Sequence, residues 1–318
     1  MRASLDTRRL DLFTQTPCTE ITLLSTVTPQ YKIQTPRGAV TAHHIIHATN
    51  GWTSHLLPGL RGKIFPFRGL MTAQRPGMGL STPPGGRAHI FYYSLGFDYL
   101  TQQPKQSGEA SCEGELLFGG GAVQGERIAL SEIGVTDDSA YNMAIAAYIQ
   151  GALPEFFGRT NWGAEGEPDP PRRAATSQAG KADDPSPSPW TSGRVKALWT
   201  SIMGFSADLQ PWVGRVPHAV SGRAVLPPMP IPTHRSLTSV SLLEKDVAVR
   251  SLAAPGEWVS AGYSGEGMVH AWLCAHALAL MLLGLEEEQS DPTWFPYEYR
   301  LTQKRLKRAT VERLIDRF

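Results

Sequence analysis

The sequence predicts a mixed α/β protein, on two observations. Short runs rich in β-branched residues fill the first sixty residues, and a strand pattern passes through a glycine-rich turn into a long apolar helix within residues 256–285. The chain has 318 residues, and because domains average roughly 150 residues this length allows one large domain or two modest ones. The 31 glycines and 25 prolines exceed their average share, which predicts long loops.

The composition excludes several classes of protein. Lys and Arg number 30 against 29 Asp and Glu, so the formal net charge of +1 gives no field that would attract nucleic acid or an anionic membrane. Cys18, Cys112 and Cys274 are widely spaced and form no C-x-x-C motif, which argues against a disulfide framework and a thiolate zinc site. The first residues lack the apolar core of a secretory signal. We therefore expect a cytoplasmic protein with no nucleic-acid partner and no membrane span.

The first half of the chain reads as strands. Strand patterns at 10–14, 19–27, 31–35 and 39–48, with a turn at 36–38, predict a meander. Strand-like pieces from 64 to 118, separated by Gly/Pro loops, predict a second and largely antiparallel sheet. Asp137 and Ser139 are candidate caps for a helix that runs through Tyr141 to about Ala152, with Pro154 just beyond it.

The second half alternates irregular and helical stretches. Residues 164–189 contain no large apolar side chain, and 224–254 hold a proline-rich segment at 227–232, so both are predicted to be flexible insertions. The apolar stretch 269–285 predicts a buried helix. Residues 297–318 carry seven Lys/Arg against three acids and predict a surface helix docked by one apolar stripe, formed by Val311, Leu314, Ile315 and Phe318.

The strongest local signal for chemistry is the glycine-rich turn at 262–267. A strand enters this turn and an apolar helix leaves it, so unpaired backbone N–H groups converge at the positive end of a helix. That arrangement suits anionic or electron-rich ligand atoms, although a strand-to-helix connection without a ligand remains open. As a dinucleotide fingerprint the turn is degenerate, because His270 stands where a third glycine is required.

The sequence argues against a hydrolase site and against a metal site. A hydrolase elbow would need glycine where Glu266 stands. His43, His44 and His47 look like a metal cluster, but a strand pattern divides them between two faces, so no metal site is expected.

Four segments, in order, carry a resemblance to a known family. They read RGAVTAHHIIHATNGWT (37–53), IFPFRGLM (64–71), WTSIMGFSADLQPWVGRVP (199–217) and GYSGEGM (262–268). Together they resemble the fungal branch of the FAD-dependent amino-acid and amine oxidoreductases, the D-amino-acid oxidase-like superfamily that includes glycine oxidase and sarcosine oxidase. The resemblance covers nearly the whole chain apart from the two insertions. It implies hydride transfer from a small amine or amino-acid substrate to FAD, with flavin-binding and β-rich substrate domains interwoven.

The resemblance also implies a division of the chain. It assigns 1–60 to a partial FAD-binding domain, 61–163 to the substrate domain and 190–223 to a return to the interface of the two. The composition predicts a disordered insertion at 164–189 and an irregular insertion at 224–255. The resemblance assigns 256–318 to the C-terminal part of the FAD-binding domain, with a basic tail helix.

The resemblance gives roles to residues in three turns and one pocket, and singles out no catalytic residue. The cofactor would lie against Ala48, Thr49, Asn50, Gly51 and Trp52, under a loop with Gly204, Asp208, Pro211 and Gly214, and before the turn of Gly262, Tyr263, Ser264, Gly265, Glu266, Gly267 and Met268. The turn would aim N–H groups at the pyrimidine edge of the flavin ring. The substrate pocket would be lined by Tyr92, Tyr93, Tyr99 and Gln102, unless these are core residues. Arg68 would either pair with a substrate carboxylate or hold a strand end.

One family feature is missing. Family members open with a strand, a G-x-G-x-x-G turn and a helix that bind the pyrophosphate of FAD, and these 318 residues contain no such unit; 119–124 also fails the spacing. We therefore expect an N-terminally truncated member whose FAD binding is weak or absent. The alternative is a non-catalytic remnant or binding module that keeps the substrate-domain fold.

Overall fold

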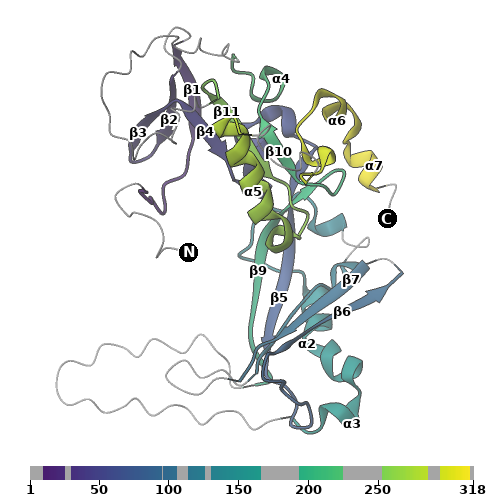
Figure 1. Ribbon diagram of the computed structural model, residues 1–318. Coiled ribbons are helices and arrows are strands. Elements are labelled where there is room, and N and C mark those ends of the chain that lie inside the picture. The colour runs from purple at the N-terminus through teal and green to yellow at the C-terminus, as the bar shows by residue number, and fades with distance from the viewer. Residues whose placement is uncertain are drawn as a thin grey trace, which may run out of the picture. The chain divides into compact units, whose positions relative to one another are not determined.

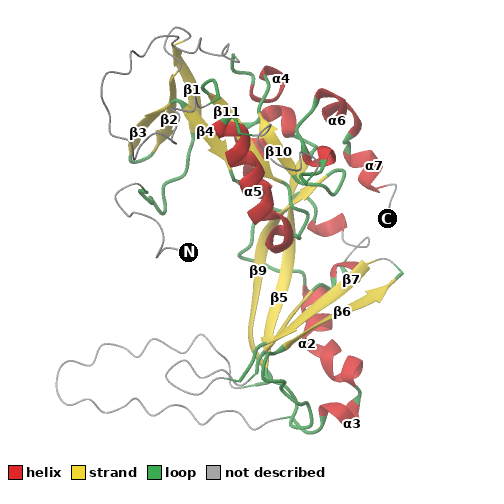
Figure 2. Ribbon diagram, in the orientation of Figure 1, coloured by secondary structure: helices red, strands yellow, loops and turns green. Residues whose placement is uncertain are grey.

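The chain folds into two compact units (Figure 1). A computed structural model describes residues 10–25, 30–94, 96–105, 114–125, 130–165, 193–224, 253–285 and 294–315. Unit 1 comprises Met1–Phe65 and Gly204–Arg317, and unit 2 comprises Pro66–Met203. Unit 2 is thus inserted into the chain of unit 1, and both units contain strands and helices (Figure 2). The predicted mixed α/β class is confirmed.

A three-stranded antiparallel meander opens unit 1. It consists of β1 (Glu20–Ser25), β2 (Gln30–Thr35) and β3 (Gly38–Ala42), and its small core centres on Ile21 and Tyr31. The strand expected at 10–14 is wrong: residues 10–13 are irregular, and their apolar side chains are exposed. Alternation alone could not make a strand there, because a strand also needs a neighbour for its backbone groups.

The second sheet of unit 1 has the order β10-β11-β4, with β4 at His44–His47, β10 at Trp212–Arg215 and β11 at Gly256–Ala261. β11 runs parallel to β4 and antiparallel to β10. The single strand expected over 39–48 is therefore wrong, since the chain bends at His43 and sends β3 and β4 into different sheets. All of β11 is buried, as expected for a strand between two neighbours.

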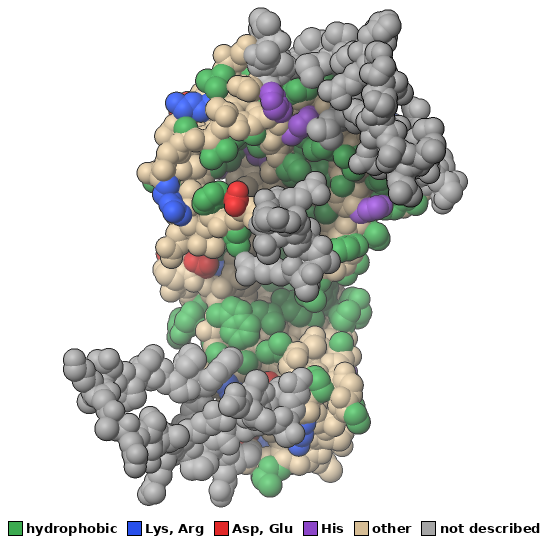
Figure 3. Space-filling view, turned by 60° about the vertical axis from the view of Figure 1, so that its left-hand side comes forward, with side chains coloured by type: hydrophobic (Ala, Val, Ile, Leu, Met, Phe, Trp, Pro, Cys, Tyr) green, Lys and Arg blue, Asp and Glu red, His purple; other side chains and the backbone are tan. Residues whose placement is uncertain are grey.

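Helix α5 (Gly267–Leu283) packs on β10 and β11. Its inner side joins a core with Val213, Trp258 and Phe295, and it ends at Gly284, whose φ of +66° favours glycine. The prediction of a buried helix is only half right, because Trp272 and Leu273 are 66% and 54% exposed. Apolar side chains at the surface are visible in Figure 3. No helix among the described residues is long and apolar enough to cross a membrane.

Short helical segments complete unit 1. They are η3 (Asn50–Trp52), α1 (Thr53–Leu56), η4 (Pro58–Leu60), α4 (His218–Ser221), η8 (Tyr297–Tyr299), α6 (Gln303–Arg308) and α7 (Val311–Ile315). The single tail helix expected after residue 297 is thus divided into separate turns. Leu306 and Leu314 are buried and dock this tail.

Unit 2 is built on the antiparallel sheet that the sequence predicts. Its strand order is β6-β7-β8-β5-β9, and the pairs β6·β7, β7·β8 and β5·β8 are antiparallel. The strands are β5 (Ile64–Gln74), β6 (Arg87–Tyr93), β7 (Gly96–Gln102), β8 (Leu116–Gly119) and β9 (Val195–Ser206), with helical segments η5 (Ala122–Gln124), η6 (Leu130–Glu132), α2 (Met143–Phe157) and α3 (Arg159–Trp162). Helix α2 covers one sheet face through a core that includes Leu100, Phe118 and Ile149.

Helix α2 differs from its predicted bounds. Its N-cap is Asn142, and it continues through Pro154 instead of ending before that residue. Proline cannot donate to the carbonyl four residues earlier, that of Gln150. Arg194 supplies the missing donor, because its Nη2 lies 2.7 Å from the Gln150 carbonyl oxygen.

Other expectations fall outside the described residues. Most of the two predicted insertions lie in 166–192 and 225–252, and Cys112 and Phe318 are also outside. Cys18 and Cys274 are free thiols.

Candidate functional site

Two turns meet at one edge of the β10-β11-β4 sheet. Because β4 and β11 are parallel, their carboxyl ends lie at the same edge, the usual ligand-binding edge of such a sheet. β4 leads into the turn of Ala48–Trp52, and β11 leads into the turn that begins at Gly262. The structure therefore brings together two of the three turns that the sequence singles out.

Hydrogen bonds join these turns to the third segment. The Asn50 side-chain oxygen accepts the N–H of Gly262 at 3.0 Å and that of Tyr263 at 3.4 Å. The Ser264 N–H donates to the carbonyl of Gly204 at 2.7 Å. A Cβ at Gly204 would lie 2.3 Å from the Asn50 side-chain oxygen, so this close approach requires glycine.

Backbone strain concentrates at the same place. Four non-glycine residues in the described part of the chain have positive φ, and three of them, Asn50 (+43°), Leu209 (+66°) and Ser264 (+52°), belong to these segments. Such conformations cost roughly 1–3 kcal/mol each and persist where the surroundings over-determine them, commonly at functional sites.

Unpaired backbone donors lie at the start of α5. Among the described residues, no acceptor pairs with the N–H groups of Gly265, Gly267 and Met268. The 17-residue helix places its positive end there. Gly265 needs its φ of +89°, whereas a Cβ at Gly267 would touch only Tyr263, at 3.9 Å. The Glu266 carboxylate lies 3.0 Å from His270 and does not cap the helix.

The loop after Gly204 is held by hydrogen bonds and an ion pair from the C-terminal segment of the chain. Asp208 forms an ion pair with Arg305 of α6 at 2.8 Å, and the carbonyl of Pro211 accepts another guanidinium N–H. Burial raises the pKa of Asp208, but Arg305, Ser206 and the Gln210 N–H outweigh that effect and hold the pKa below its usual range. Sequence reasoning missed Arg305, since nothing distinguishes it among the basic residues of the tail.

The remaining residues expected at the cofactor lie as follows. Ala48, Thr49 and Trp52 are exposed on the first turn, and Gly51 is buried beneath it. Gly214 lies within β10, opposite Val259. The Tyr263 hydroxyl is 2.8 Å from that of Ser260, and the Met268 side chain is fully exposed.

Strand alternation divides the residues expected in the substrate pocket. Tyr92 and Tyr99 are exposed on one face of the β6–β7 hairpin. Tyr93 lies on the other, helix-covered face, where its hydroxyl donates to Asp98 at 2.6 Å. Gln102 is buried and accepts from Arg87 at 2.6 Å. The period of two in a strand could have separated Tyr92 from Tyr93.

Arg68 is engaged within unit 2. Its Nε lies 2.7 Å from the buried carboxylate of Glu132, and its Nη1 lies 2.8 Å from the carbonyl of Ala140. These contacts join the interior of β5 to η6 and to the loop before α2, so Arg68 does not hold a strand end.

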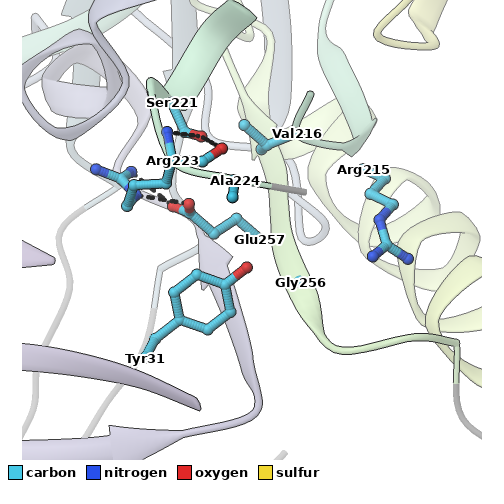
Figure 4. Close-up of a pocket in the computed structure, with 8 residues that line it drawn as sticks. All are labelled: Tyr31, Arg215, Val216, Ser221, Arg223, Ala224, Gly256 and Glu257. Carbon is cyan, nitrogen blue, oxygen red and sulfur yellow. Dashed lines mark hydrogen bonds and ion pairs between the residues drawn. The ribbon is translucent and has the colours of Figure 1, made fainter. Parts of the chain in front are cut away.

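A second feature lies at the opposite edge of the β10-β11-β4 sheet, near the start of β11. Figure 4 shows a small pocket in which the Tyr31 ring points toward Gly256 and Glu257. Glu257 accepts from Arg223 at 2.6 Å and lies 2.8 Å from the ring nitrogen of His47. The three histidines do not converge, and the described residues contain no cluster of three potential metal ligands.

The carboxyl-edge site fits the ring of a flavin better than its pyrophosphate. Its free donors are three neutral N–H groups at the positive end of a helix, which suit the electron-rich carbonyl and ring nitrogen atoms of a flavin. A doubly charged pyrophosphate would require a further cradle of charge-assisted hydrogen bonds, and Arg305 is already paired with Asp208.

Comparisons with known proteins identify the family of this chain. A family model described as FAD dependent oxidoreductase (DAO) matches residues 1–281, whereas no curated protein matches the sequence. Glycine oxidase from Geobacillus kaustophilus is a structural neighbour with a TM-score of 0.48 and 14% identity, covering 92% of this chain and 53% of that one. Iminodiacetate oxidase from Chelativorans sp. BNC1 has a TM-score of 0.47 and 13% identity, covering 88% and 51%. The chain thus spans about half the length of these neighbours. Because the family model matches most of the sequence, the protein belongs to the family of FAD-dependent oxidoreductases.

Proposed function

We propose that this chain forms the ring side of the flavin site of an FAD-dependent oxidoreductase that acts on amines or amino acids. The observation that carries the proposal is the convergence of three unpaired N–H groups at the start of α5 with the strained turns at Asn50 and Ser264. Membership of the family supports FAD as the ligand. The four quoted segments support placement in the fungal branch.

The residues of the site would orient the cofactor and stabilise charge. When bound, FAD would supply the acceptor for a hydride that leaves a substrate carbon next to an amine. The N–H groups of Gly265, Gly267 and Met268 would donate to the pyrimidine edge of the ring, where negative charge collects on reduction. Asn50 would hold the glycine turn in place through the N–H of Gly262. No residue of the site needs to act as a nucleophile.

Unit 2 carries a candidate surface for the apolar part of a substrate. Tyr92 and Tyr99 offer exposed aromatic rings on the β6–β7 hairpin, next to Phe97. These rings suit the apolar part of an amine. Arg68 is committed to Glu132, so we do not assign it to a substrate carboxylate.

The chain on its own would bind FAD weakly. Charge-assisted hydrogen bonds to a pyrophosphate contribute roughly 1.5–3 kcal/mol each. A chain that lacks two or three of them would bind more than about a hundredfold more weakly than a member with a complete cradle. We expect the protein to purify colourless and to lose added FAD on desalting.

A titration of the protein with FAD, followed by flavin fluorescence, tests the proposal. Gly267→Val adds a side chain where the backbone would approach the ring, and the structure has room for its Cβ, so the fold should tolerate it. We expect this variant to weaken FAD binding at least tenfold. Gly151→Val is the matched control, because Gly151 has no neighbour within 4 Å and lies on α2 of unit 2. Equal FAD affinity in Gly267→Val and wild type would remove the glycine turn from the site.

The second candidate is a non-catalytic binding module of the same fold. The observation that favours it is the absence of a G-x-G-x-x-G unit from these residues. The two functions differ in redox chemistry: an oxidoreductase bleaches the flavin band under saturating FAD and an amine substrate without oxygen, and a binding module leaves it unchanged.

A further inference from the structure

Arg305, a residue of the C-terminal tail, is the most heavily bonded side chain near the candidate flavin site. It is 8% exposed. Its Nε and Nη2 donate to the two carboxylate oxygens of Asp208, each at 2.8 Å. Nη2 also donates to the carbonyl of Gln210, and Nη1 donates to those of Pro211 and Tyr299. All five N–H donors of the guanidinium are therefore used.

The same guanidinium stacks on an aromatic ring. Its central carbon lies 3.8 Å from the ring centroid of Trp212, which is fully buried. The indole N–H of Trp212 donates to the hydroxyl of Ser206 at 2.8 Å, and that hydroxyl donates to Asp208 at 2.7 Å. Arg305 thus closes a ring of contacts with Asp208, Ser206 and Trp212.

This ring of contacts encloses a strained turn. Leu209 has a φ of +66°, which is unfavourable for a residue with a Cβ atom and a bulky side chain. The turn is held by the Leu209 N–H on the carbonyl of Ser206 and by the Gln210 N–H on Asp208. Without Arg305, Asp208 would lose its counter-charge. The turn would also lose the hydrogen bonds to the Asp208 carboxylate and to the carbonyls of Gln210 and Pro211.

The turn is directly connected to the glycine turn of the candidate flavin site. The Ser206 N–H donates to the hydroxyl of Ser264 at 3.1 Å, and the Ser264 N–H donates to the carbonyl of Gly204 at 2.7 Å. A change in the position of 206–212 therefore reaches Ser264, the residue just before Gly265. The conformation of one turn depends on that of the other.

We propose that Arg305 is a positioning residue of the flavin site. It holds segment 206–212 in its strained conformation and, through the contact between Ser206 and Ser264, sets the glycine turn at 262–267. This role requires the planar fork of arginine, because a lysine ammonium cannot bond both carboxylate oxygens and three carbonyls while stacking on an indole. Only the identity of the ligand rests on the proposed function.

Hydrogen–deuterium exchange without added cofactor tests the positioning role. We expect Arg305→Ala to accelerate amide exchange at Leu209 and Gln210 at least tenfold and at Ser264 at least threefold, while the amides of β11 change less than twofold. Arg308→Ala is the matched control, since Arg308 is an exposed arginine on the same helix, and it should change none of these rates. Wild-type exchange at Leu209 and Gln210 in Arg305→Ala would overturn the proposal. Equal acceleration in β11 would also overturn it, because it would indicate general destabilisation.

Two further variants keep the test decisive if Arg305→Ala does not fold. Arg305→Lys keeps the charge and the helix propensity, and we expect it to open the turn nearly as much as alanine does. Full protection in Arg305→Lys would mean that charge alone suffices, and would contradict the proposal. Asp208→Asn removes the counter-charge from the other side and should accelerate exchange at the same amides.

A titration with FAD separates this inference from the proposed function. If wild type binds FAD, Arg305→Lys should weaken binding and change the shape of the bound flavin absorption band, whereas Arg308→Ala should do neither. A bound spectrum identical in Arg305→Lys and wild type would contradict positioning of the ring site. If wild type shows no FAD binding, the proposed function fails, and the exchange rates still decide the role of Arg305.

Discussion

The side-chain oxygen of Asn50 accepts a hydrogen bond from the backbone N–H of Gly262 at 3.0 Å, across 212 residues of sequence. This bond joins the carboxyl ends of β4 and β11, where the candidate flavin site forms. Asn50 also has a φ of +43°, a region in which asparagine and aspartate are enriched among non-glycine residues.

Asn50→Ala should therefore destabilise unit 1 by about 2–3 kcal/mol. The change leaves the N–H groups of Gly262 and Tyr263 without their acceptor and places alanine in a left-handed conformation. Asn50→Asp keeps an oxygen acceptor and should cost less than about 1 kcal/mol. Urea unfolding measures both variants, and an Asn50→Ala protein as stable as Asn50→Asp would show that the bond between the turns contributes nothing.

Asp98 should be the most sensitive polar residue of unit 2. Its fully buried carboxylate accepts from the hydroxyls of Tyr93 and Tyr148 and from the Gly121 N–H, each at 2.6 Å. Burial and the bond to Asp98 raise the pKa of both tyrosines, so they remain neutral donors. Asp98→Ala should lower the free energy of unfolding by about 3–5 kcal/mol. Asp138→Asn, at an exposed position, should change it by less than about 0.5 kcal/mol.

A double-mutant cycle tests the repair of α2 by Arg194. Arg194→Ala should cost about 1–2 kcal/mol, because it leaves the carbonyl of Gln150 without a donor. In a Pro154→Ala background the same change should cost about 1 kcal/mol less, since residue 154 then has an N–H that can bond that carbonyl. Costs of Arg194→Ala that are equal in the two backgrounds would contradict this explanation.

The buried pair of Glu257 and Arg223 should make stability depend on acid. Burial raises the pKa of Glu257, but the hydrogen bonds from His47 and Arg223 and the charge of Arg223 outweigh it, so the pKa lies below its ordinary value of 4.5. A lowered carboxyl pKa stabilises the fold above the unfolded pKa, and this stabilisation disappears as pH falls through the folded pKa.

Glu257→Gln should accordingly cost roughly 3 kcal/mol near pH 7 and progressively less as pH falls below about 4. Unfolding by urea at a series of pH values measures the difference between wild type and variant. A difference that stays constant from neutral pH down to about pH 3 would mean that Glu257 does not carry the acid sensitivity.

Local sequence patterns predicted the helices and strands of this fold better than the contacts between them. The glycine turn and its helix were predictable, because a strand pattern, three glycines and an apolar run stand next to one another. The contact between that turn and Asn50 could be predicted only from the resemblance to a family. Residues 212 positions apart give no local signal that they touch. The same distance argument explains why the partner of Asp208, which lies 97 residues away at Arg305, was not predicted.

Local rules failed where a distant side chain compensated for them. Proline normally ends a helix, yet α2 continues because Arg194 bonds the orphan carbonyl of Gln150. The prediction that both tyrosines line the substrate pocket failed for a different reason. Tyr92 and Tyr93 are adjacent in a strand, so their side chains point to opposite faces and only Tyr92 remains exposed.

Hydrogen–deuterium exchange of the wild-type protein with and without saturating FAD tests the central claim most directly. The N–H groups of Gly265, Gly267 and Met268 have no acceptor among the described residues, so they should exchange quickly in the free protein. If they bind the flavin ring, saturating FAD should slow their exchange at least tenfold. The amides of Asn50 and Gly204 should be slowed less. The exchange rates of the backbone amides in β6 and β7 should not change. The contradicting result is unchanged exchange at Gly265, Gly267 and Met268 at FAD concentrations where the fluorescence of the added flavin shows that the protein has bound it. That result would mean that this turn does not receive the flavin ring.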